Sequence, residues 1–132
     1  MKRFLLDTHI WLWAAIEPHK LTSEVRRSLN SPEAERFLSA ISLWELSVMV
    51  EKKRFALKED FAVWVQRSIS DLNLNETPLA WKVAYELRYI LPNQKDPADR
   101  FLAATAIAFD LILVTADQKL IGVPGLKVLA NI

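Results

Sequence analysis

Cysteine is absent from this chain of 132 residues, and glycine occurs only twice, as Gly122 and Gly125. Without cysteine the chain forms no disulfide and offers no thiolate to a metal. Because both glycines stand near the C-terminus, neither a Walker phosphate loop nor a dinucleotide-binding glycine fingerprint is possible. Its two histidines do not form a His-Glu-x-x-His zinc motif, and the Gly-x-Ser-x-Gly nucleophile elbow does not occur. Carboxylate chemistry is what remains.

Long apolar runs are missing as well. The longest, residues 101–109, is far shorter than the ~18 to 20 residues that cross a membrane. The apolar stretch at the N-terminus is too short for a secretory signal, so we expect an unprocessed, soluble protein of the cytoplasm with no membrane contact. A chain of this length buries roughly two thirds of the surface it exposes when unfolded, which predicts one domain over residues 1–132.

Neither sign of charge dominates, because 17 basic side chains face 16 acidic ones, for a formal net charge of +1. If the four acids discussed below are set aside, 17 basic side chains face 12 acidic ones, and this excess of +5 suits a polyanionic partner but does not require one. Apolar residues make up 52% of the chain, which is rich for a small domain. Either some of them are exposed and covered by a partner, or the helix that holds Trp11, Leu12 and Trp13 is buried on two sides.

Strand and helix patterns alternate along the chain. Strands are expected over 3–7, 36–41, 72–76 and 111–115, with an edge strand over 127–129. Helices are expected over 8–15, 22–29, 42–51, 60–70, 77–87 and from Asp96-Pro97 onward. This alternation predicts a parallel sheet, whose functional crevice lies beyond the carboxyl ends of the strands.

Four acids stand where such a fold would bring them together. Asp7 closes the first strand and Asp117 follows the strand over 111–115, while Glu45 and Asp99 lie in the first turns of helices. Carboxylates crowded at one sheet edge repel each other unless a positive charge holds them. Because magnesium prefers oxygen ligands, the pattern indicates a divalent-metal site and so a metal-dependent enzyme.

Each acid also has an ordinary explanation as a helix cap. Asp7 and Asp117 would cap the turns that follow them, Glu45 would complete a capping box begun by Ser42, and Asp99 would occupy the third position of another. Four independent caps, however, have no reason to converge, whereas a hard cation needs several oxygens in one place.

The neighbours of these acids are open to more than one interpretation. Asp96 precedes a proline, so N-capping is its favoured role. Thr8 and Thr115 would contact a substrate phosphate, steady nearby carboxylates or serve as plain turn residues. Arg100 would contact a phosphate or neutralise the adjacent acids, and we favour the pairing. His9 is interpreted as structural, because magnesium prefers oxygen.

Four segments of the chain resemble the motifs of PIN-domain toxins of the VapC type, in the family's order and spacing. They are residues 5–13 (continuing to Pro18 and Leu21), 39–47, 96–106 and 113–117. The chain departs from the family where members often carry His and Arg, at Gln94 and Lys95.

The resemblance implies a three-layer α/β/α sandwich with a central, mostly parallel sheet. It implies an endoribonuclease that depends on Mg²⁺ or Mn²⁺, with Asp7, Glu45, Asp99 and Asp117 as ligands and catalytic acids. It also implies an RNA substrate, the toxin role in a type II toxin–antitoxin pair, neutralisation by a VapB-type antitoxin that covers the active-site groove, and a homodimer. The rival interpretation is a catalytically inert PIN-like module that only binds proteins. A receiver-like domain phosphorylated on Asp7 is far weaker, because it leaves Glu45 and Asp99 without a role.

Overall fold

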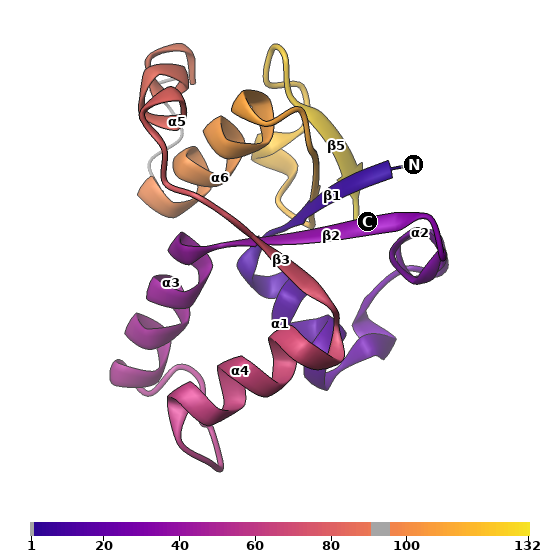
Figure 1. The fold of residues 1–132 in the computed structure, drawn as a ribbon, viewed down its shortest axis with the longest axis vertical. Coiled ribbons are helices and arrows are strands. Elements are labelled where there is room, and N and C mark those ends of the chain that lie inside the picture. The colour runs from indigo at the N-terminus through magenta and orange to yellow at the C-terminus, as the bar shows by residue number, and fades with distance from the viewer. Residues whose placement is uncertain (1, 91–95) are drawn as a thin grey trace.

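The computed structural model describes residues 2–90 and 96–132, and its centre is one five-stranded sheet with every strand pairing parallel (Figure 1). In sheet order, the strands are β3 (Leu74–Thr77), β2 (Ala34–Ser39), β1 (Lys2–Leu6), β4 (Ile112–Thr115) and β5 (Lys127–Ala130). The helices are α1 (Thr8–Ile16), α2 (Ser23–Asn30), α3 (Ala40–Glu51), α4 (Phe61–Asp71), α5 (Trp81–Glu86) and α6 (Pro97–Ala108), with short 3₁₀ turns at Pro18–Lys20, Leu87–Tyr89 and Gln118–Leu120. All five expected strands are present, with small shifts at their ends.

Helices cover both faces of the sheet, because alternate side chains of each strand point to opposite faces. Phe4 and Leu6 of β1 belong to the core beneath α1 to α4, whereas Leu5 belongs to the core beneath α5 and α6. In Figure 1 these two helical groups lie on opposite sides of the strands. The three-layer α/β/α sandwich and its parallel sheet are therefore confirmed.

The start of α3 differs from the prediction. Strand β2 pairs with β3 as far as Ser39, whose hydroxyl then accepts a hydrogen bond from the Ile41 amide at 3.1 Å. Ser39 is thus the N-cap, and Ser42, the predicted cap, is buried inside the helix. The predicted strand is present, but its predicted end at residue 41 and the capping box at Ser42 were wrong, because the ladder ends at Ser39 and leaves that earlier serine free to cap.

Thr77 is also not a helix cap. It is the last residue of β3, paired with Ser39, and its buried hydroxyl has no hydrogen-bond partner among the described residues. Helix α5 starts only at Trp81, after Ala80, which makes no side-chain cap. The predicted helix start at Thr77-Pro78 was wrong because strand pairing takes Thr77 into the sheet.

The apolar surplus is distributed between the interior and the surface. In α1, Trp11 and Leu12 are buried and Trp13 is half-buried, whereas His9 and Ile16 of the same helix are exposed. The Trp11 indole donates to the Ser68 hydroxyl at 3.1 Å. Trp44 and Trp81, by contrast, are 55% and 84% exposed. In the part of the chain that the structure describes, no helix is long and apolar enough to span a membrane.

Candidate active site

The ends of two neighbouring strands define the base of the site. β1 lies in the middle of the sheet, between β2 and β4. After β1 the chain first forms β2 and β3 on one side of it, and later forms β4 and β5 on the other side. Asp7 follows β1, and Asp117 lies two residues beyond β4. The Asp7 amide donates to the Val114 carbonyl of β4 at 3.1 Å, which ties the two strand ends together. Such a switch point in a parallel sheet is where ligands bind.

Two helices bring further acids to the same place. Glu45 projects from α3 and Asp99 from the first turn of α6, and both line a pocket of about 400 Å³ with Asp7 and Asp117. Asp96 lines it as well. Side chains that are far apart in the sequence therefore lie on one pocket and not on separate faces of the molecule.

Three of these acids also cap helices. The Oδ1 atoms of Asp7, Asp96 and Asp117 accept hydrogen bonds from backbone amides two or three residues later, at 2.8, 2.9 and 2.9 Å respectively. The capping role expected for Asp96 is thus present. Capping and a place in the pocket coexist, because the amides that a cap satisfies also hold the carboxylate in one orientation.

Two buried threonines steady the acids. The Thr8 hydroxyl contacts the Glu45 carboxylate and lies 3.0 Å from the Ser42 hydroxyl. The Thr115 hydroxyl accepts from the Asp117 amide at 3.0 Å and also forms a hydrogen bond with Asp7. Thr8 is 2% exposed and Thr115 is fully buried, so both hydroxyls are used inside the protein.

Burial and neighbouring acids raise the pKa of two of these carboxyl groups. Burial, the charge of Asp96, and the hydrogen bond and charge of Asp117 raise the pKa of Asp99 to about 8. Burial also raises the pKa of Asp7, although Thr115 and the Ile10 amide oppose this effect. A carboxylate that is surrounded by other carboxylates and removed from water is stabilised by any positive charge that enters.

Within the pocket, the charge of His9 lowers the pKa of Asp7 but does not outweigh the effect of burial. The ion pairs between described residues, Lys20–Glu17, Arg67–Glu59 and Lys127–Asp110, lie outside the pocket. Arg100 forms no ion pair with the adjacent acids, so the pairing favoured from the sequence is not formed. Its Nη2 instead donates to the Leu87 carbonyl at 3.5 Å, and its buried Nε has no partner among the described residues.

The donor set fits a hard divalent cation. The acids provide only oxygen ligands, which suit Mg²⁺ or Mn²⁺, and Asp96 and Asp117 raise the pKa of Asp99 through their charge. Within residues 2–90 and 96–132, no three Asp, Glu or His side chains stand close enough together to hold an ion as they are placed. Binding would therefore draw the carboxylates closer, which their mutual repulsion opposes without a cation.

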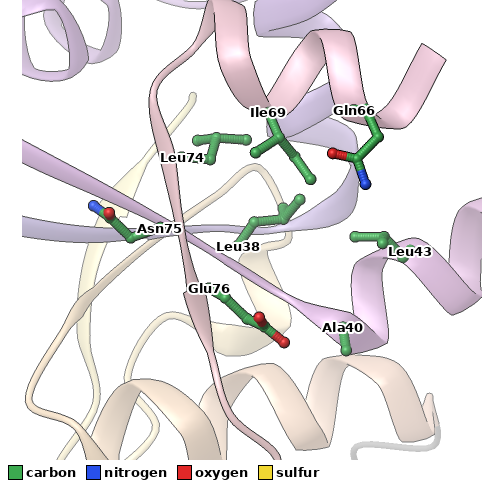
Figure 2. A pocket seen from close by; sticks show the side chains of 8 residues that line it. All are labelled: Leu38, Ala40, Leu43, Gln66, Ile69, Leu74, Asn75 and Glu76. Atoms are coloured by element: carbon green, nitrogen blue, oxygen red, sulfur yellow. The ribbon is translucent and has the colours of Figure 1, made fainter. Parts of the chain in front are cut away.

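A second cavity, of about 330 Å³, lies between the β2–β3 edge and helices α3 and α4 (Figure 2). The residues that line it are mainly apolar, and Leu38, Leu43 and Ile69 point toward one another; Glu76 is the one acid among the described lining residues. Because this cavity offers one carboxylate and the acidic pocket offers several, the acidic pocket is the better candidate for metal-dependent chemistry.

Sequence reasoning missed part of the pocket wall. His9, Trp13 and Ala116 line the pocket together with the acids. The spacing of His9 and Trp13, one helical turn apart and just after Asp7, was the signal that could have placed them there. The family departures at Gln94 and Lys95 lie outside the residues that the structure describes.

The fold and the pocket define an α/β/α domain with an acidic pocket at the switch point of a parallel sheet. Residues 4–126 match the PIN domain family model. The chain is 32% identical over 121 residues to Ribonuclease VapC22 of Mycobacterium tuberculosis, with 91% of each chain covered. The chain belongs to the PIN-domain family, among its VapC-type members.

Solved structures share the fold. VapBC2 from Rickettsia felis, bound to a DNA fragment from their promoter, matches with a TM-score of 0.75 and 22% identity, over 97% of this chain and 98% of that one. DNA-bound VapBC from Salmonella typhimurium matches with a TM-score of 0.70 and 20% identity over the whole of both chains. At this level of identity the likeness concerns the fold.

Proposed function

We propose that this protein is the toxin of a type II toxin–antitoxin pair and acts in the cytoplasm as an endoribonuclease that hydrolyses RNA phosphodiester bonds with Mg²⁺ or Mn²⁺. The observation that carries the proposal is the convergence of Asp7, Glu45, Asp99 and Asp117 on one pocket of a PIN-domain chain. The name of the 32% identical relative, a ribonuclease, supports RNA as the substrate.

Asp7 and Asp99 would be the direct ligands of the cation. Glu45 would bind the cation or orient the attacking water, and Asp117 would complete the outer shell. A bound divalent cation lowers the pKa of a water molecule and stabilises negative charge on the phosphate oxygens.

The surrounding residues prepare the acids for this role. The Ile10 amide holds Asp7 at 2.8 Å, and Thr8 fixes the carboxylate of Glu45. Thr8 and Thr115 would therefore act on the substrate phosphate through the acids they hold, because their own hydroxyls are already engaged. Arg100 would contact a phosphate if its guanidinium turned from the Leu87 carbonyl, since it forms no ion pair with the acids beside it in the described structure.

A VapB-type antitoxin would neutralise the toxin by covering the pocket, and the toxin would form a homodimer. The VapBC assemblies among the solved structures of this fold support such a partner. The exposed indoles of Trp44 and Trp81 support further contacts, because large exposed apolar side chains often mark protein interfaces.

RNA cleavage by the wild type, by Asp7→Asn and by Asp71→Asn tests the proposal, each with Mg²⁺ and with EDTA. Asp71 is an exposed acid at the end of α4, so its variant controls for the loss of one negative charge. We expect cleavage only by the wild type and Asp71→Asn, and only with Mg²⁺. Equal residual activity in all samples would contradict the proposal and favour an inert binding module.

A further inference from the structure

One wall of the acidic pocket is aromatic. His9 and Trp13 stand one turn apart on α1, and both line the pocket that holds the four acids. Their ring centroids are 5.8 Å apart, and the ring planes are tilted by 53°. No other described residue that lines this pocket has a ring. The two side chains form a corner beside the carboxylates.

The core of the protein uses only part of these rings, because Trp13 packs against the core with one part of its surface and His9 is not a core residue. The inner face of α1 is formed by Ile10 and Trp11, both fully buried. His9 is exposed and Trp13 is half-buried, so ring surface remains open toward the pocket. An aromatic surface in that position is available to whatever occupies the pocket.

A nucleobase is the group that fits this wall, and this step rests on the proposed function. The base of a nucleotide hangs from the ribose next to the phosphodiester, so a phosphate at the acids brings a base close to the pocket wall. Proteins hold unpaired bases by stacking them on aromatic side chains, histidine included. We propose that His9 and Trp13 form a stacking subsite for an unpaired nucleobase next to the scissile phosphate of single-stranded RNA.

Lys20 is not required for this subsite. Its Nζ lies 5.9 Å from the Trp13 ring centroid, but it is ion-paired with Glu17 at 3.2 Å. The inference therefore depends on the two rings. Because every base has a flat face, such a subsite favours unpaired RNA and discriminates little among bases.

RNA binding to the inactive variant Glu45→Gln in Mg²⁺ tests the inference without cleavage. The probes are a fluorescent oligoadenylate and an abasic ribose-phosphate oligomer of the same length. Removal of the bases should weaken binding by about five- to a hundredfold. Adding Trp13→Leu should weaken binding of the oligoadenylate by a similar factor and leave binding of the abasic oligomer unchanged. Trp13→Phe keeps an aromatic ring, so with this substitution the oligoadenylate should bind almost as tightly as with Trp13.

His9→Ala and His19→Ala provide a matched pair, because both histidines are exposed and only His9 lines the pocket. His9→Ala should weaken oligoadenylate binding several-fold, and His19→Ala should not. Thermal melts monitored by circular dichroism confirm folding, and Trp81→Leu controls for the loss of an exposed indole.

Two results would overturn the inference and favour a protein partner for the rings. The first is that removal of the bases weakens RNA binding by the same factor in Glu45→Gln and in Glu45→Gln with Trp13→Leu. The second is that His9→Ala leaves the binding of oligoadenylate unchanged. Failure of the proposed function would look different. The wild type would then not cleave RNA in Mg²⁺. The effect of Trp13→Leu on oligoadenylate binding, and its absence for the abasic oligomer, could still be measured.

Discussion

The hydroxyl of Thr8, the first residue of α1, donates a hydrogen bond to the carboxylate of Glu45 in the second turn of α3. Ser42 places its own hydroxyl 3.0 Å from the same Thr8 oxygen. Because a hydroxyl has one proton and an ionised carboxylate only accepts, Thr8 donates to Glu45 and accepts from Ser42. This chain of hydrogen bonds joins the two helices that carry one side of the pocket.

Thr8→Val should lower kcat/KM for RNA cleavage by about ten- to a hundredfold, as is typical when a residue that orients a ligand is lost. The valine keeps the volume but leaves Glu45 without its donor. Thr8→Ser retains the hydroxyl and should restore most of the activity. Steady-state kinetics with both variants checks this, and equal activity of Thr8→Val and wild type would contradict the positioning role.

Divalent cations should stabilise the fold through the acidic pocket. At a hundredfold excess over Kd, a bound cation adds about 2.7 kcal/mol to the free energy of unfolding. Asp99→Asn removes a proposed ligand, so the rise in Tm on addition of Mg²⁺ should be much smaller than in the wild type. Asp71→Asn should keep the full rise. Identical shifts in all three proteins would show that the cation binds elsewhere.

The stability of the metal-free protein should fall as the pH rises from about 5 to about 8. Burial and the charges of Asp96 and Asp117 raise the pKa of Asp99 to about 8 in the folded protein, against a usual value of 3.8. Between these values the folded carboxyl keeps a proton that the unfolded chain has lost. Because the unfolded chain then binds fewer protons, rising pH favours unfolding.

Urea titrations in EDTA at the two pH values measure this effect as a lower unfolding midpoint at the higher pH. Asp99→Asn cannot ionise at this position, so its stability should depend less on pH. A wild-type profile as flat as that of Asp99→Asn would contradict the raised pKa.

Arg36 should be one of the most sensitive positions for stability outside the pocket. From β2, its Nε donates to the Leu72 carbonyl at 2.8 Å and its Nη1 donates to the Leu29 carbonyl, so it holds the C-terminal ends of α4 and α2. Arg36→Lys should lower the free energy of unfolding by about 2 to 3 kcal/mol, because an ammonium group lacks the planar fork. In urea titrations the exposed Arg27→Lys should change it by less than about 0.5 kcal/mol. A similarly small effect of Arg36→Lys would refute the assignment.

Much of the fold followed from local patterns. The alternation of strands and helices predicted the parallel sheet, because parallel strands need a crossover between them. The boundaries at Ser42 and Thr77 failed for a common reason. Each residue has the chemistry of a helix cap, but pairing between β2 and β3 extends to Ser39 and Thr77 and decides where the strands end.

Part of the candidate site could also be predicted from the sequence, and part could not. Asp7 and Asp117 could be placed at one sheet edge from the sequence, because each follows a strand. Glu45 and Asp99 were grouped with them because each lies in the first turn of an expected helix, and the family resemblance implied the same four acids. The contact of Thr8 with Glu45 and the aromatic wall of His9 and Trp13 depend on how the helices sit against one another, which local spacing does not specify.

By itself, the sequence determined which residue types are available: many carboxylates, no thiols and few glycines, in an order that dictates strands and helices. Only the tertiary structure decided which charges face each other. Sheet order places β1 between β2 and β4, and the packing of α6 adds a third segment, so that Asp7, Asp99 and Asp117 line one pocket. Arg100, next to Asp99, donates instead to a backbone carbonyl. The physical reason is that electrostatic interactions depend on distance and burial, and both are set by packing between segments far apart in the chain.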